Sequence, residues 1–256
     1  MNVGQIIKDS LKYPFSDWKK FLILGIIILI TVTYDFVWVL GFNNILIWYI
    51  LFTIGLIIQL LVVVGYQFRI IKSTLAGADE LPVFNNWISM FSDGFKVKIV
   101  EVVYSIPVIL LVLIFAKISY ASILWSTSIN PTNIPYFEIV VKWLLIAFLY
   151  KILIYPIFRI AIAHMANNES KLGSAFKLRE ILNKIGNVGW GKLIIWYIAV
   201  GFIFIILLII GDILAGLLGL ISLFLGIIFL YLVIMPYLYI FVSRSTALIY
   251  KSDEKV

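Results

Sequence analysis

The chain has 256 residues, of which 63% are hydrophobic and only 13% are charged, whereas a soluble domain is about half apolar and a quarter charged. Its net charge of +7 does not indicate nucleic-acid binding, because the basic residues gather between long apolar runs, where membrane topology and anionic lipid explain them. The absence of cysteine excludes disulfides and thiolate chemistry. Apolar runs of about 20 residues recur, so we expect an all-α, polytopic protein of the cell membrane.

The first third of the chain is expected to form an amphipathic helix followed by two membrane helices. Residues 2–12 place apolar side chains at helical spacing between polar ones, which predicts an amphipathic helix. Membrane helices are expected at about 21–40 and 45–71, separated by a short uncharged turn. Arg69 and Lys72 lie at the end of the second of these, where cations suit a helix C-terminus.

The middle third repeats this order. Residues 83–93 predict a short amphipathic helix, with Gly94 as its C-cap. Membrane helices follow at about 97–120 and 138–165. Residues 121–137 between them are rich in Ser, Thr, Asn and Pro, and we expect them to form the only sizeable outer loop.

The last third predicts an amphipathic helix at 170–185 and membrane helices at about 193–210 and 217–240. Gly211 and Asp212 are expected close to the turn between these membrane helices, with Asp212 as an N-cap. The whole pattern is six transmembrane helices in three hairpins. An interfacial amphipathic helix precedes each hairpin, with its apolar face in the headgroup region of the cytoplasmic side.

We treat residues 1–256 as a single membrane domain with an internal repeat. The predicted units are 1–72, 73–166 and 167–256. Two short echoes support the repeat: Phe68-Arg69-Ile70 with Phe158-Arg159-Ile160, and Lys72-Ser73-Thr74 with Arg244-Ser245-Thr246. The alternative is that hairpins with interfacial helices recur because membranes favour them.

An aromatic ring followed by a lysine stands directly ahead of three apolar runs, which is typical of an interfacial anchor. The anchor residues are Trp18, Lys19, Phe95, Lys96, Trp190 and Lys192. When the amphipathic segments and both termini are assigned to the cytoplasm, only Lys117, Lys142 and Lys151 of the 20 basic residues fall outside that side. This bias predicts cytoplasmic N- and C-termini. A cysteine placed at Asn130 should then react with a membrane-impermeant thiol reagent added outside the cell.

The opening residues 6–14, Ile-Ile-Lys-Asp-Ser-Leu-Lys-Tyr-Pro, are followed by Asp17-Trp18 and a six-helix pattern over the whole length. This combination resembles the domain of unknown function 4013, a group of archaeal membrane proteins. The layout is more distantly similar to the membrane domain beside some glycerophosphodiester phosphodiesterases. The resemblance implies an archaeal source and a six-helix membrane domain, and it supplies no activity and no site residues.

Several motifs resemble catalytic signatures but lack a required part. Residues 186–192 match the start of a phosphate-binding loop, but Leu193 stands where magnesium needs Ser or Thr. Asp35 and Asp212 do not follow the motifs of an intramembrane aspartyl protease. His164 is the only histidine, and we interpret it as a helix C-terminal cation or an interfacial ring. We therefore expect no enzymatic activity, no metal and no cofactor.

Small residues form a stripe that lets helix backbones approach closely. They are Gly211, Ala215, Gly219, Ser222 and Gly226. The stripe indicates helix packing inside the monomer or, alternatively, a homo-oligomer interface. Pro107, Pro156 and Pro236 predict kinks in three membrane helices, and such kinks can frame a cavity.

Three ionisable residues are candidates for positions inside the membrane: Asp35, Lys151 and Glu101. A charge there is costly unless it is paired or hydrated. Counting residues from the helix ends places the heads of Asp35 and Lys151 at similar depth, which predicts a contact between them. Glu101 can reach inner-side water more easily. The alternative for Lys151 is a water-filled cavity or a backbone carbonyl freed by a proline.

Two classes of function remain open from the sequence. The first is a structural or partner- and lipid-organising membrane component, because no constellation of catalytic groups is present. The second is a transporter, channel or small-solute binder with a polar site at mid-membrane. The expected partners are membrane lipids, together with a homo-oligomer or a partner membrane protein, and not nucleic acid.

Overall fold

The computed structural model describes residues 1–39, 41, 44–129 and 136–253, and every regular element in these ranges is helical. The elements in chain order are α1 (Val3–Lys12), η1 (Tyr13–Ser16), α2 (Trp18–Thr31), α3 (Thr33–Val39), α4 (Ile45–Ile57), η2 (Ile58–Val63), α5 (Val64–Leu75), α6 (Trp87–Ile129), α7 (Tyr136–Asn167), η3 (Leu172–Phe176), α8 (Leu178–Val188), α9 (Trp190–Ile221), α10 (Leu223–Phe229), η4 (Leu230–Ile234) and α11 (Met235–Lys251). Of the η elements, η1 and η3 are 3-10 helices, whereas η2 and η4 are π-helices. The helical prediction is confirmed for the described ranges.

Five helices in the described part of the chain are long and apolar enough to cross a membrane, which indicates a membrane-embedded protein. They are Ile45–Leu75, Trp87–Ile114, Leu144–Asn167, Trp190–Ile221 and Leu223–Lys251. The apolar run expected at 21–40 is instead divided into α2 and α3 by a break at Val32. The Thr31 and Thr33 hydroxyls donate to the carbonyl oxygens of Ile28 and Ile30, so both compete with the helical ladder at the end of α2.

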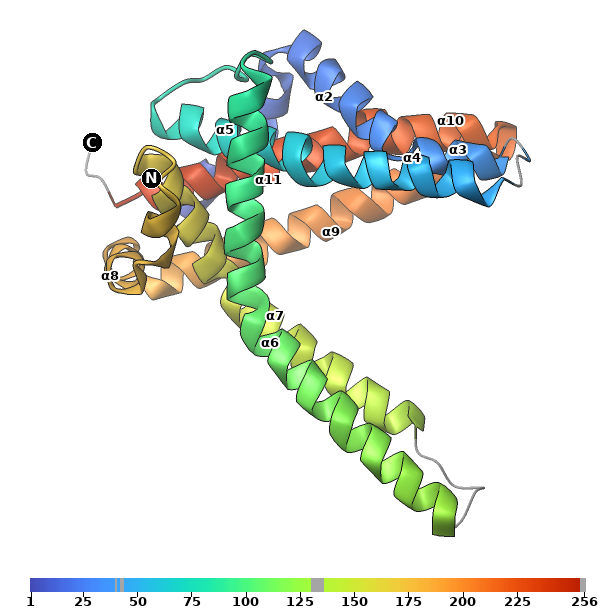
Figure 1. Ribbon diagram of the computed structural model, residues 1–256. Helices are drawn as coiled ribbons and strands as arrows, with labels where there is room; N and C mark the ends of the chain where they lie inside the picture. Colours follow the sequence, from blue (N-terminus) through green and yellow to red (C-terminus); the bar gives the residue numbers. More distant parts are fainter. Residues whose placement is uncertain (40, 42–43, 130–135, 254–256) are drawn as a thin grey trace.

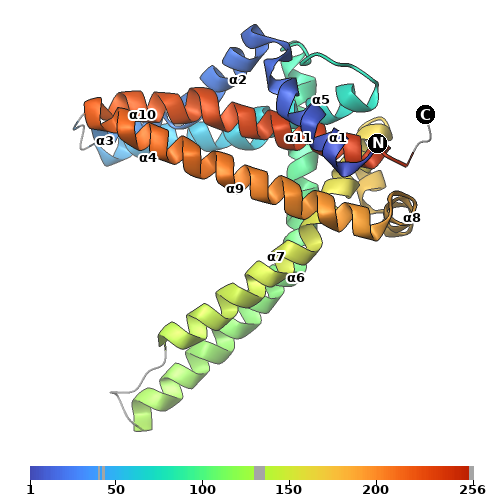
Figure 2. The same cartoon turned by 180° about the vertical axis from the view of Figure 1, so that it is seen from behind.

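The molecule consists of a bundle and a projecting arm (Figures 1 and 2). Helices α2–α5 and α9–α11 run together in the bundle, whereas α6 crosses it and continues into the arm beside α7. Pro107 lies inside α6 and Pro156 inside α7, and each removes a backbone donor from its helix. Figure 1 shows that α6 changes direction partway along its length.

The crossing of α6 over the bundle depends on two glycines. A Cβ on Gly65 would overlap the carbonyl oxygen of Met90, and a Cβ on Gly94 would overlap that of Leu61. The expectation that Gly94 caps a separate helix at 83–93 is therefore wrong. Because this glycine lets two backbones touch, α6 passes through it without ending.

The N-terminal helix α1 packs against the C-terminal helix α11. Ile6 is fully buried, so part of the apolar stripe of α1 covers the protein's own core. The guanidinium of Arg244 lies 2.8 Å from Asp9 and 3.0 Å from Asp79, and 4.3 Å from the centre of the Tyr13 ring. This cluster joins α1, η1 and the segment after α5 to α11.

Two connections far from the chain ends differ from expectation. The turn expected near Gly211 and Asp212 is at Ser222 instead, because α9 runs on through both residues. Glycine does not end a membrane helix when the apolar sequence continues on both sides. In the middle third, α6 extends to Ile129, so most of the loop expected at 121–137 is helical. Asn130, the intended labelling position, lies outside the described residues.

The segment expected to form the third amphipathic helix, 170–185, is divided into η3 and α8. Ile181 and Ile185 in α8 are fully buried against the core. The starting residues of the two π-helices η2 and η4 are separated by the same number of residues as 72–74 and 244–246. The internal repeat itself stays a prediction.

Candidate functional site

The ionisable residues expected inside the membrane do not come together. Asp35 lies in α3 of the bundle, Lys151 lies exposed on α7, and no ion pair joins them in the described structure. Glu101 forms an ion pair with Lys98 at 2.7 Å. The expected contact between Asp35 and Lys151 is absent because α7 leaves the bundle with α6 (Figure 1), and equal depth does not make two helices neighbours.

Two glycines of the stripe of small residues contact other parts of the same chain. A Cβ on Gly226 would overlap the carbonyl oxygen of Ala215 and lie 3.3 Å from the backbone nitrogen of Gly219. A Cβ on Gly211 would lie 2.7 Å from the Ile234 side chain. Gly211 and Gly226 are therefore covered within the chain, whereas a Cβ on Gly219 would meet nothing within 4 Å.

The three anchor rings are exposed: Trp18, Phe95 and Trp190. Lys19 is exposed as well, whereas the other two anchor lysines bond to neighbouring loops. Lys96 donates to the carbonyl oxygen of Ser170 at 3.1 Å, and Lys192 donates to that of Ser252 at 3.2 Å. The rings thus face outward, while two of the lysines hold loops in place.

His164 lies between three helices. Its Nδ1 is 2.8 Å from the Tyr250 hydroxyl and its Nε2 is 3.2 Å from the Glu180 carboxylate, so it links α7, α11 and α8. Among the described residues, no group of His, Asp and Glu side chains is arranged to hold a metal ion. We interpret this histidine as a structural link.

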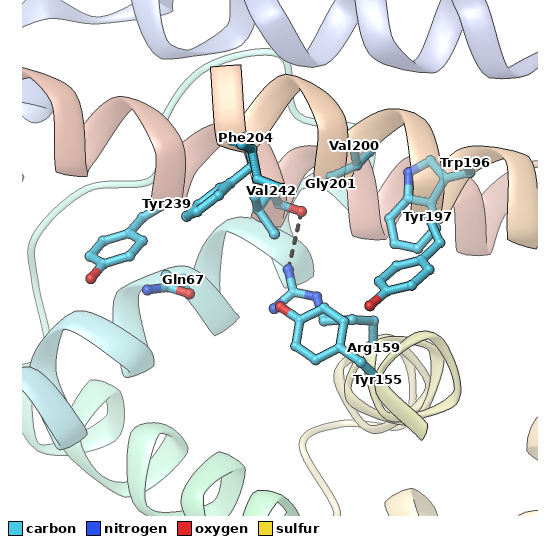
Figure 3. A pocket seen from close by; sticks show the side chains of 11 residues that line it. Gln67, Tyr155, Arg159, Trp196, Tyr197, Val200, Gly201, Phe204, Tyr239 and Val242 are labelled. Carbon is cyan, nitrogen blue, oxygen red and sulfur yellow. Dashed lines mark hydrogen bonds between the residues drawn. The ribbon is translucent and has the colours of Figure 1, made fainter. Parts of the chain in front are cut away.

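A cavity of about 370 Å³ lies between α5, α7, α9 and α11 (Figure 3). This volume falls within the usual range of ligand pockets in proteins. Phe204 and Ile205 of α9 provide an apolar wall, and Ile205 is 56% exposed, so this wall continues onto the outer surface of the molecule. A Cβ on Gly201, in the same wall, would meet nothing within 4 Å.

Arg159 of α7 is the charged residue of this cavity and is only 8% exposed. Its Nε and Nη2 donate to the Thr246 hydroxyl at 2.9 and 2.7 Å, and Nη2 also donates to the carbonyl oxygen of Val242 at 3.1 Å. In the described part of the chain, Nη1 donates no hydrogen bond and no carboxylate pairs with this guanidinium. A buried charge without a counter-charge is unfavourable.

Four further side chains of the cavity carry donors that find no hydrogen-bond partner among the described residues. They are Gln67, Tyr155, Trp196 and Tyr197, and the indole nitrogen of Trp196 is buried. The rings of Tyr155 and Tyr197 lie 5.9 Å apart. In Figure 3 the hydroxyl of Tyr197 is turned to the side where Arg159 and Tyr155 lie. A partly buried donor without a protein partner is available to a ligand, so this concentration marks the cavity as a candidate site.

Two other arginines near the ends of returning helices bond to carboxylates or to loop carbonyls. Arg244 is 5% exposed on its side chain and pairs with two carboxylates, as described above. Arg69 of α5 donates to the carbonyl oxygens of Val83, Asn85 and Asn86. Arg159 differs from both because one of its nitrogens faces an unfilled volume.

Sequence reasoning missed this site. It noted Arg159 only as part of the echo with 68–70 and counted it among the basic residues of the inner side. The available signal was local: apolar residues flank this arginine on both sides, at 157–158 and 160–163, so it lies within a membrane helix and not at its end. The cavity itself depends on how α7 and α9 diverge, which no local pattern shows.

Residues 47–216 match a family model described as protein of unknown function (DUF4013). No curated protein and no solved structure matches the chain. The matched range extends from α4 into α9 and includes most of the cavity.

Proposed function

Because the chain belongs to the DUF4013 family, whose description assigns no activity, we propose from the geometry that it is a multi-pass membrane protein that binds and organises lipid. A lipid-organising role does not require a set of catalytic side chains within reach of one another. It requires surfaces that bind acyl chains and head groups. The archaeal source, and the distant similarity to the membrane domain beside glycerophosphodiester phosphodiesterases, are carried forward as predictions from residues 6–18.

We further propose six spans in three hairpins, with both termini in the cytoplasm. In this topology α2 and α3 together form the first span, broken at Val32. α1, the start of α6, and α8 lie at the inner surface, where the anchor rings reach the headgroup level. The support is the excess of basic residues on that side.

This topology is tested with single cysteines, since the chain has none of its own. Asn44→Cys, between the first two spans, is expected to react in intact cells with a membrane-impermeant thiol reagent. Ser252→Cys is expected to react only after permeabilisation. The opposite pattern would reverse the orientation, and equal reactivity at both positions in intact cells would contradict six spans.

The observation that carries the lipid-binding proposal is the cavity beside Arg159. Its apolar wall is continuous with the exposed outer surface at Ile205, so an acyl chain can enter from the membrane without crossing it. A transporter or channel, the alternative, needs polar groups along a path through the membrane. In the described structure, Asp35, Glu101 and Lys151 lie on separate parts and form no such path. This separation favours lipid binding over transport.

The test is retention of lipid after purification. Native mass spectrometry of the protein released from detergent is expected to show bound lipid on the wild type. Gly201→Leu is expected to fill the cavity without a clash and to reduce the bound lipid. Gly216→Leu is the matched control, because it makes the same change on α9 where a Cβ also meets nothing within 4 Å. Equal lipid retention by the two variants would refute the proposal.

A further inference from the structure

We infer that the cavity beside Arg159 binds the anionic head group of an acidic lipid. This inference rests on the proposed lipid-binding function and specifies the charge of the ligand and the group that recognises it. The head group is held by Arg159 and the neighbouring donors, and one acyl chain lies along the apolar face of α9.

The first argument is the kind of polar group that surrounds the cavity. Arg159 Nη1 and the Tyr155 and Tyr197 hydroxyls offer hydrogen-bond donors, and in the described chain none has an acceptor. The Trp196 indole nitrogen is too deeply buried to reach a ligand. A guanidinium cannot accept a hydrogen bond. A ligand that satisfies this set must be rich in acceptors, as phosphate and carboxylate oxygens are.

The second argument is the missing counter-charge. Arg244, which is buried to a similar degree, has Asp9 and Asp79 within 3.0 Å. Arg159 has a hydroxyl, a carbonyl oxygen and the Tyr155 ring, whose centre lies 5.9 Å away, and no carboxylate of the described chain is paired with it. An anion in the cavity would supply the charge that the protein supplies elsewhere.

The third argument distinguishes an amphiphile from a free anion. Beyond Tyr197, the wall that α9 contributes is apolar, with Val200, Phe204 and Ile205 following one another along the helix. Ile205 reaches the exposed surface, which a membrane would cover. A small soluble anion would leave this wall without contacts, whereas an acyl chain attached to the head group covers it.

The experiment is a competition between two lipids with identical acyl chains. Purified protein is incubated with phosphatidylglycerol and phosphatidylcholine, and bound species are counted by native mass spectrometry. We expect the wild type to prefer phosphatidylglycerol by about tenfold, which corresponds to one hydrogen bond to a charged group. Equal binding of both lipids would overturn the inference while leaving lipid binding intact. Equal lipid retention by the Gly201→Leu and Gly216→Leu variants would instead refute the proposed function.

Two sets of variants assign the preference to the cavity. Arg159→Gln is expected to abolish the preference, whereas Arg69→Gln, at an arginine bonded to loop carbonyls, is expected to retain it. If Arg159→Gln does not fold, Tyr197→Phe and Gln67→Leu remove donors without touching the bonds that join α7 to α11. An unchanged preference in both of these variants would overturn the inference. Displacement of lipid by glycerol phosphate as effectively as by phosphatidylglycerol would assign the site to a free anion and overturn it as well.

Discussion

Replacing Gly94 by alanine adds one methyl group where α6 crosses η2. The new Cβ would overlap the carbonyl oxygen of Leu61, and backbone cannot rotate away as a flexible side chain does. Overpacking costs about 1–3 kcal/mol, and we expect the upper end here. Alanine also favours the helix over glycine by about 1 kcal/mol. The net loss in the free energy of unfolding is therefore about 2 kcal/mol.

In a chain of this size that loss corresponds to a decrease in Tm of about 4–8 °C. The assay is thermal unfolding in detergent, followed by the fluorescence of the eight tryptophans. Gly216→Ala is the control, because a Cβ there meets nothing within 4 Å, so its Tm is expected to stay equal or to rise slightly. If both variants unfold at the wild-type temperature, the backbone contact between α6 and η2 does not limit stability and the reasoning is refuted.

Three further outcomes follow from the contacts described above. Arg244→Met is expected to lower the free energy of unfolding by about 2 kcal/mol, because it removes charge-assisted hydrogen bonds of a buried guanidinium while the carboxylates of Asp9 and Asp79 stay accessible to water, and chemical denaturation will measure it. Gly226→Leu is expected to separate α9 from α10 and lower the Tm without changing the oligomeric state by light scattering. Hydrogen bonds from Lys177 and His164 lower the pKa of Glu180 below its usual 4.5, so its contribution to stability is present above that pH and lost as the pH falls through the lowered value. The stability difference between wild type and Glu180→Gln should therefore be seen above pH 4.5 and disappear in acid.

The sequence predicted the helical class and most of the apolar spans, because burial of backbone groups in a membrane leaves a long helix as the simplest solution. It did not predict the break at Val32, because threonines such as the two beside it are also common inside membrane helices that have no break. It also misplaced the turn of the last third. In a soluble protein, a glycine such as Gly211 often indicates a turn. In this chain, Gly211 instead packs against the Ile234 side chain.

The candidate site was less accessible to sequence reasoning than the fold. Depth along a helix can be counted from residue numbers, and that count led to the pairing of Asp35 with Lys151. Which helices are neighbours depends on the direction of the arm, and this is set by close backbone contacts at Gly65 and Gly94. Arg159 belongs to a cavity only because α9 lies opposite it, which no pattern in α7 reveals.

The contact between α1 and α11 has a consequence for the order of synthesis. Asp9 and Arg244 are 235 residues apart along the chain, so the partner of the first helix is among the last segments to be made. At a translation rate of about 5–20 residues per second, α1 waits roughly 10–50 s before Arg244 leaves the ribosome. During that interval the buried face of Ile6 has no α11 to cover it, and the surface of the bilayer is the nearest apolar environment. A nascent chain stopped before Arg244 would thus carry its first helix on the membrane, and completion of the last helix would draw that first helix into the bundle.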